Sequence, residues 1–120
     1  MPSPLEIAFE PDAMAATAML YLRGRAGFRE SRQLRDALFA AIATLGDKNL
    51  VVHLEGLSRL DTAAMAVLVE GLVATRDSGP DVFLVCASES VRRVFRLAGF
   101  DEALVRCFDC WADYEQAVAV

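Results

Sequence analysis

Short runs of β-type apolar residues alternate along the chain with segments whose apolar residues recur every three to four positions. The first two runs, Leu5–Phe9 and Ala18–Gly24, are separated by Pro11, Asp12 and a group of small residues. Proline and small polar residues between two extended runs are typical of a chain reversal. We therefore expect the chain to begin with an antiparallel pair of strands.

The pattern next predicts a helix and a central strand. Apolar residues recur at helical spacing over residues 34–45, with Ser31 near the start and Gly46 where such a helix ends. The following segment, Asn49–Leu57, reads NLVVHLEGL; it is rich in β-formers and too short for a helix. We predict that it forms a buried strand.

Two further helices enclose one more strand. Asp61 offers an N-cap to the run Ala63–Ala74, which is apolar on nearly every side, and a strand is expected at Asp81–Ala87. Ser88 then begins a third helix that Gly99 ends. The inner face of that helix is predicted to consist of four apolar residues: Val91, Val94, Phe95 and Ala98.

A last strand is expected over residues 104–108 and a last helix over about 112–120. Strands that alternate with helices imply parallel neighbours joined by crossovers. The sequence thus predicts an α/β domain with a mixed, mostly parallel sheet of about five strands packed with about four helices.

Composition limits the class of protein. Of the 120 residues, 55% are apolar and 24% charged, which is typical of a packed globular domain. A net charge of −5 disfavours nucleic acid as a partner, and we interpret Arg92, Arg93 and Arg96 as a solvated helix face. The apolar run Ala63–Val69 is too short to cross a membrane, and no secretory signal is visible. We therefore expect a cytoplasmic protein without membrane insertion.

No motif in the sequence predicts catalysis, a metal site or a cofactor. Cys107 and Cys110 have C-x-x-C spacing, but no second Cys or His pair accompanies them, so a structural interpretation is favoured over a redox or zinc site. His53 is the only histidine and lies among apolar strand residues, which is typical of a structural residue. We expect a protein that is not an enzyme and needs no cofactor.

The stretch RLDTAAMAVL places Thr62 directly after the expected N-cap Asp61. Its plain interpretation is a helix start. The alternative is a phosphorylation site, because a helix N-terminus stabilises an anion by about 0.3–1 kcal/mol. Asp61 would repel the phosphate by a comparable amount, so a phosphate would act mainly by placing charge and bulk on a docking face.

The two segments LVVHLEGLSRLDTAAMAVLVEGL and DVFLVCASESVRRVFRLAGF resemble the STAS domain family, best known as bacterial anti-sigma-factor antagonists. The resemblance implies one STAS-like domain over residues 1–120, with Thr62 at the family's phosphorylation position and a partner-binding stretch of Asp61, Thr62, Ala63, Ala64 and Met65. The family's third-helix pattern is matched by Val91, Arg93, Phe95, Leu97, Gly99 and Phe100.

Several positions depart from the family pattern. In the family, the phosphorylated residue is usually followed by a small hydroxylated residue, a glycine and a leucine. In this chain these positions are occupied by Ala63, Ala64 and Met65. In the third strand, His53 occupies a position where the family commonly has an acidic residue. At the start of the first helix, the family's "GELD" is replaced by GRAG over residues 24–27. An acid that helps the family grip its kinase is therefore missing.

Two functions follow from the resemblance. The first is an anti-sigma-factor antagonist-like protein that docks on a partner kinase or anti-sigma factor and is switched by phosphorylation at Thr62. The alternative is a STAS subunit of a bacterial lipid-transport ABC system that binds its ATPase, in which Thr62 is an interface residue. A small-ligand binder of the same fold is a third hypothesis with no residue to support it, and the formation of a homodimer stays open.

Overall fold

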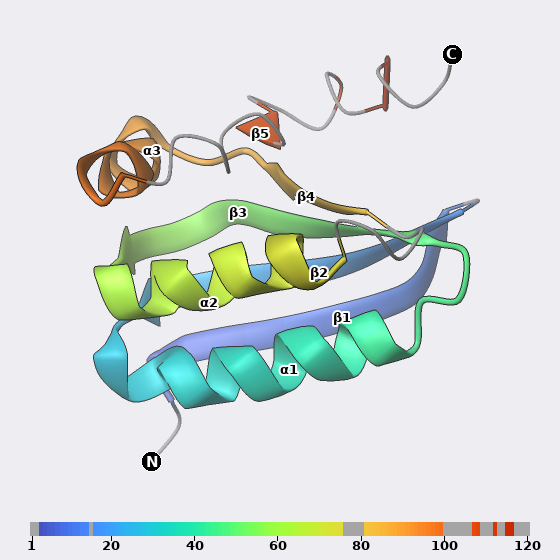
Figure 1. Ribbon diagram of the computed structural model, residues 1–120, viewed down its shortest axis with the longest axis horizontal. Helices are drawn as coiled ribbons and strands as arrows, with labels where there is room; N and C mark the ends of the chain where they lie inside the picture. Colours follow the sequence, from blue (N-terminus) through green and yellow to red (C-terminus); the bar gives the residue numbers. More distant parts are fainter. Residues whose placement is uncertain are drawn as a thin grey trace.

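The computed structural model of the protein describes residues 3–14, 16–75, 81–99, 107–108, 112 and 115–116. The strands lie in the order β1-β2-β3-β4-β5, with β1 and β2 antiparallel and each later pair parallel (Figure 1). The strands are β1 (Leu5–Met14), β2 (Thr17–Ala26), β3 (Asn49–Leu60), β4 (Val82–Val85) and β5 (Cys107–Phe108). The helices are the 3-10 turn η1 (Phe28–Glu30), α1 (Ser31–Ala43), α2 (Thr62–Ala74) and α3 (Glu89–Leu97).

The α/β class and the mixed sheet are confirmed. Within the described residues, four strands have four residues or more, β5 has two, and there are three α-helices. With β5 counted, the sheet has the roughly five strands that alternation of elements predicts, whereas the three described α-helices are fewer than the predicted four or so. The helix predicted over residues 112–120 and most of the strand predicted over residues 104–108 fall outside the described residues.

The opening hairpin is longer than predicted. Pro11 and Asp12 were expected in the turn, but both lie within β1, which continues to Met14. The strand register shifts between Glu10 and Met14, so the ladder is interrupted at the proline. Proline has no N–H to donate and is tolerated at such irregular places on an edge strand, which explains the difference.

The capping residues and the glycine that were predicted at helix ends lie at helix ends in the structure. Ser88 Oγ accepts a hydrogen bond from the Val91 N–H at 3.2 Å and caps α3. Gly99 follows α3 with φ of 80°, a left-handed conformation that glycine adopts without a Cβ clash. The N-cap of α2 is Asp61, as predicted.

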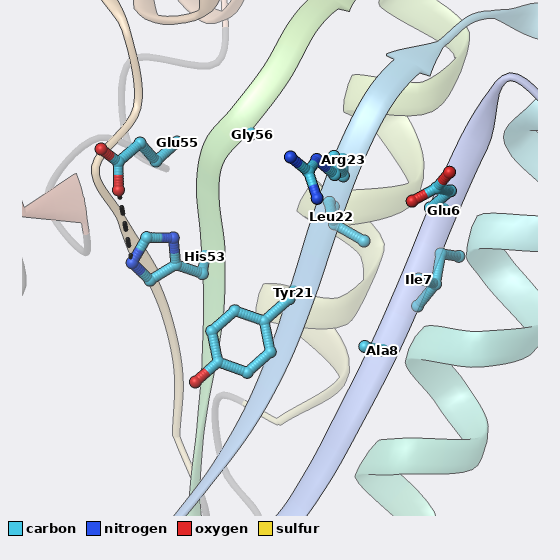
Figure 2. Close-up of a pocket in the computed structure, with 9 residues that line it drawn as sticks. All are labelled: Glu6, Ile7, Ala8, Tyr21, Leu22, Arg23, His53, Glu55 and Gly56. Atoms are coloured by element: carbon cyan, nitrogen blue, oxygen red, sulfur yellow. Dashed lines mark ion pairs between the residues drawn. The ribbon is translucent and has the colours of Figure 1, made fainter.

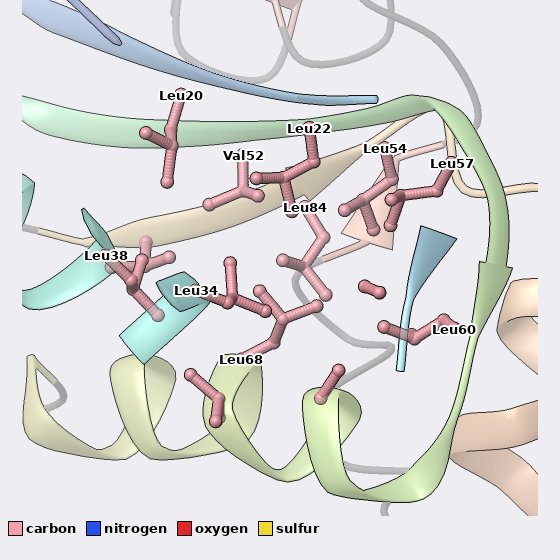
Figure 3. Close-up of a cluster of buried hydrophobic side chains, with 14 of the residues drawn as sticks. Leu20, Leu22, Leu34, Leu38, Val52, Leu54, Leu57, Leu60, Leu68 and Leu84 are labelled. Atoms are coloured by element: carbon pink, nitrogen blue, oxygen red, sulfur yellow. The ribbon is translucent and has the colours of Figure 1, made fainter. Parts of the chain in front are cut away.

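The helices cover one face of the sheet, where α1 and α2 lie side by side (Figure 1). The strand side chains that point to this face alternate with those that do not, and they meet leucines of both helices (Figure 3). Fully burying one such leucine stabilises the fold by about 1.5–3 kcal/mol. The central residues of this core are Leu20, Leu22, Val52, Leu54 and Leu84 from the strands with Leu34, Leu38 and Leu68 from the helices.

The opposite face of the sheet carries a second, smaller apolar cluster. Met19, Val51 and Val85 are buried there, and Tyr21 and Cys86 pack against them. The two faces therefore alternate along β2, β3 and β4, as a sheet buried on both sides requires. Among the described helices, none combines the length and the apolar character needed to span a membrane.

Candidate docking and phosphorylation site

Asp61 fixes the start of α2. Its Oδ1 accepts hydrogen bonds from the backbone N–H groups of Ala63 at 3.1 Å and Ala64 at 3.2 Å. The Asp61 N–H itself donates to the carbonyl of Ala26 at 3.1 Å, which ties the start of α2 to the end of β2. These bonds satisfy two of the amide groups that a helix N-terminus leaves without intrahelical partners.

Thr62 is the first residue of α2, and its side chain is exposed. The position follows directly from the cap, because the residue after an N-cap lies at the end of the helix, where few neighbours surround it. Thr62 is thus accessible both to a modifying enzyme and to a docking partner. Its phosphorylation remains a prediction.

Three arginines surround the other side of the capping carboxylate. Arg25, Arg29 and Arg59 line an open hollow of about 480 Å³ together with Asp61. The parallel pairing of β2 with β3 sets Arg25 opposite Arg59, and both side chains are exposed. The neighbouring Phe28 is 75% exposed. The surface beside Thr62 is therefore basic and contains one large apolar side chain.

Gly27 separates two carboxylates at this hollow. Its N–H donates to Glu30 Oε1 at 3.0 Å. A Cβ built on Gly27 would lie 3.1 Å from Glu30 Oε1 and 3.4 Å from Asp61 Oδ2. The acid that the family pattern places before the first helix is absent here, and Glu30 supplies a carboxylate that is engaged by the backbone instead.

The predicted partner-binding stretch divides into accessible and buried residues. Thr62 is exposed, and Asp61 and Ala63 are half-buried. Ala64 and Met65 are 0% and 1% exposed and belong to the helix-side core. Partner binding by this stretch remains a prediction, and only its first three side chains can supply contact area.

The outer side of α2 continues the accessible surface beyond Thr62. Val73 is exposed, and an open apolar groove of about 520 Å³ runs between α1 and α2. Arg35 and Glu70 form an ion pair of 2.5 Å across the two helices. The apolar residues that line the groove are Phe39, Ala66, Val69, Val73 and Ala74.

Two of the three arginines of α3 have local partners that the structure describes. Arg96 pairs with Glu89, and Arg92 Nε donates to the carbonyl of Ala87 at 3.3 Å. This agrees with a solvated helix face. Of the C-x-x-C pair, Cys107 lies in β5 and Cys110 lies outside the described residues, so the structural interpretation of that pair remains a prediction.

The structure also brings together side chains from β2, β3 and the residue after β4. His53 is half-buried. Its ring centroid lies 5.6 Å from that of Tyr21 with the two rings tilted by 34°, and its Nε2 lies 4.0 Å from Glu55 Oε2 (Figure 2). The thiol of Cys86 lies beside them. Burial raises the pKa of Tyr21, and the charge of Glu10 and a hydrogen bond to it raise that pKa further. The sequence does contain one signal for this cluster: His53 and Glu55 are two residues apart in the predicted strand and therefore lie on the same face of the sheet.

The family of the chain is shown by comparison with known protein families. The STAS domain family matches residues 9–117 of the 120 residues, so the chain belongs to this family.

Solved structures of three kinds share the fold. An anti-sigma factor antagonist from Mycobacterium paratuberculosis is 17% identical, with a TM-score of 0.80 and 100% of each chain covered. The Bacillus cell fate determinant SpoIIAA in its phosphorylated form is 16% identical, with a TM-score of 0.65 and coverage of 95% of this chain and 98% of that chain. A sulfate transporter family protein from Wolinella succinogenes is 19% identical, with a TM-score of 0.69 and coverage of 92% and 98%. At these identities the likeness concerns the fold alone.

Proposed function

We propose that this STAS domain is an anti-sigma-factor antagonist-like binding protein, not an enzyme, and that phosphorylation of Thr62 switches its docking on a partner kinase or anti-sigma factor. The observation that carries the proposal is that Thr62, the first residue of α2 after the N-cap Asp61, is exposed. We define the docking surface as Thr62, Ala63, Ala66, Val69 and Val73. Its apolar residues would form the contact, and Thr62 would lie at its edge.

A phosphate on Thr62 would add about −1.5 to −2 charges to this edge at neutral pH. The N–H groups of Ala63 and Ala64 already donate to Asp61, so they are not available to the phosphate. The Asp61 carboxylate would repel the phosphate, whereas the arginines around the hollow would attract it. These effects offset one another within the domain, and the added charge and bulk act mainly on the partner.

The first test is a phosphorylation assay. The protein is incubated with ATP and a candidate partner serine kinase from the same organism, and the modified residue is located by mass spectrometry. We expect phosphate on Thr62 in the wild type and none in Thr62→Ala. Ser58→Ala is the matched control, because Ser58 is an exposed hydroxyl on the adjacent strand end. Equal labelling of the wild type and Thr62→Ala would contradict the assignment.

The second test concerns docking. The dissociation constant of the complex with that kinase is measured for the wild type, Thr62→Glu and Ser58→Glu. A charge at the docking edge that costs about 1.4 kcal/mol weakens binding about tenfold. We expect this loss for Thr62→Glu and less than about a third of it, in free energy, for Ser58→Glu. Equal affinities for all three proteins would refute a charge-controlled switch.

A second candidate is a subunit that binds the ATPase of a bacterial lipid-transport ABC system. The observation that favours it is the basic surface at residues 24–29, where Arg25 and Arg29 are exposed and the family's kinase-gripping acid is absent. In this case the Thr62 hydroxyl belongs to a constant interface. Binding to an ATPase encoded beside the gene, with no labelling by any neighbouring kinase, would favour this candidate over the first.

A further inference from the structure

Three side chains of different chemistry meet on the sheet face opposite α1 and α2. His53 and Glu55 are alternate residues of β3, and Cys86 directly follows β4. One ligand atom from each lies within 4.8 Å of the other two. We propose that His53, Glu55 and Cys86 form a binding site for a borderline-soft divalent cation, for which Zn²⁺ is the best fit. This goes beyond the proposed function and does not depend on it.

The backbone at Cys86 brings the thiol to this face. Leu84 belongs to the helix-side core and Val85 to the opposite cluster, so strict alternation would return Cys86 to the helix side. Cys86 instead packs with Val85, because its φ of 59° breaks the alternation. A left-handed conformation costs a residue with a Cβ about 1–2 kcal/mol. The fold thus holds a strained backbone at the residue that carries the thiol to His53.

The donor set selects the cation. An imidazole nitrogen, a thiolate sulfur and a carboxylate oxygen are the three ligand types of protein zinc sites. Magnesium and calcium prefer oxygen ligands, and a thiolate favours softer ions. Each of these ligand types binds a metal in its deprotonated form.

The geometry lies within reach of tetrahedral coordination. Zinc bonds of about 2.0–2.3 Å place neighbouring ligand atoms roughly 3.3–3.8 Å apart. His53 Nε2 and Glu55 Oε2 lie 4.0 Å apart, and no pair of ligand atoms exceeds 4.8 Å. The side chain of Glu55 is 75% exposed and can rotate, whereas the side chain of His53 is 18% exposed and packs against the ring of Tyr21. Closing the site therefore needs a shift of about 1 Å in its widest pair of ligand atoms.

A three-ligand site leaves one coordination position open. His53 and Glu55 line an open hollow of about 510 Å³ between β1, β2 and β3 (Figure 2), so water can reach the cation from this side. Zinc sites with three protein ligands commonly take water as the fourth ligand. The site that we propose is therefore half-exposed and exchangeable.

The test is binding of the metal alone to the full chain at neutral pH. Equilibrium dialysis with Zn²⁺ should give one ion per chain, and Co²⁺ should give a thiolate-to-metal charge-transfer absorption band. We expect Cys86→Ser to abolish the band, and His53→Gln and Glu55→Gln each to weaken Zn²⁺ binding at least about tenfold. The matched control is a Cys107→Ser/Cys110→Ser double variant, which removes the chain's other two cysteines and should keep both signals.

Thiol alkylation gives an independent readout, because Zn²⁺ should slow the modification of Cys86 in the wild type but not in His53→Gln. Circular dichroism of each metal-free variant separates loss of the site from loss of the fold. The proposal is overturned if the wild type binds no Zn²⁺, or if Cys86→Ser keeps the Co²⁺ band. It is also overturned if the double variant loses the band while keeping its fold, because the C-x-x-C pair would then be the site.

Discussion

The contribution of Asp61 to stability can be separated into its hydrogen bonds and its charge. Asp61→Ala removes the acceptor for the N–H groups of Ala63 and Ala64, and loss of such an N-cap costs about 1 kcal/mol. It also removes a negative charge from a helix N-terminus, which costs a further 0.3–1 kcal/mol or so. We therefore expect Asp61→Ala to lower the free energy of unfolding by about 1.5 kcal/mol. Asp61→Asn keeps an acceptor oxygen and should cost only about 0.5 kcal/mol.

Urea unfolding followed by circular dichroism measures both changes. With a slope of about 2 kcal/mol/M, the expected losses shift the midpoint by about 0.7 M for Asp61→Ala and about 0.25 M for Asp61→Asn. Equal losses in the two variants would refute the capping argument and assign the effect to the charge. A loss below about 0.3 kcal/mol for Asp61→Ala would mean that the two hydrogen bonds contribute nothing in solution.

Two further predictions concern the strands. Gly24→Ala should lower the free energy of unfolding in urea by about 1–3 kcal/mol more than Gly99→Ala. Both glycines have positive φ, but only at Gly24 would a Cβ meet backbone, the Pro4 oxygen at 2.1 Å, so equal losses would contradict the steric reason. Tyr21 should ionise above its ordinary pKa of 10.0 in an absorbance titration. Because the folded-state pKa is raised, its stabilising contribution is present below pH 10.0 and is lost as the pH rises through the folded pKa; an identical alkaline loss in Tyr21→Phe would refute this.

The parts of the fold that local signals encode could be predicted from the sequence. Asp61 and Ser88 each accept a hydrogen bond from a residue two or three positions later in the chain. The starts of α2 and α3 therefore depend on residues that are close in sequence. The length of β1 could not be predicted in the same way. A proline usually ends a strand. Pro11 is tolerated within β1 because the register against β2 shifts there, and only the pairing with β2 shows that shift.

The candidate site also has features that local sequence predicts and features that depend on distant parts of the chain. The exposure of Thr62 follows from its place after the cap, and the sequence was sufficient to predict it. The basic hollow beside it was missed, because Arg25 and Arg59 become neighbours only through the parallel pairing of β2 with β3. The thiol of Cys86 was missed for another reason. Its position depends on a left-handed φ, which nothing in the surrounding residues signals, since glycine or asparagine usually occupies such places.

The proposed switch and the proposed cation site share β3 but should act independently. His53 and Glu55 project from the face opposite α2, whereas Thr62 follows the end of β3 on the helix side. Coupling between two sites requires an element with two arrangements that both ligands bias, and a strand buried at the centre of a sheet supplies none. Zn²⁺ should therefore leave the affinity of the protein for its partner unchanged within about twofold, and Thr62→Glu should leave Zn²⁺ affinity equally unchanged. A reciprocal shift of more than about fivefold in both affinities would refute this independence and would identify β3 as the coupling element.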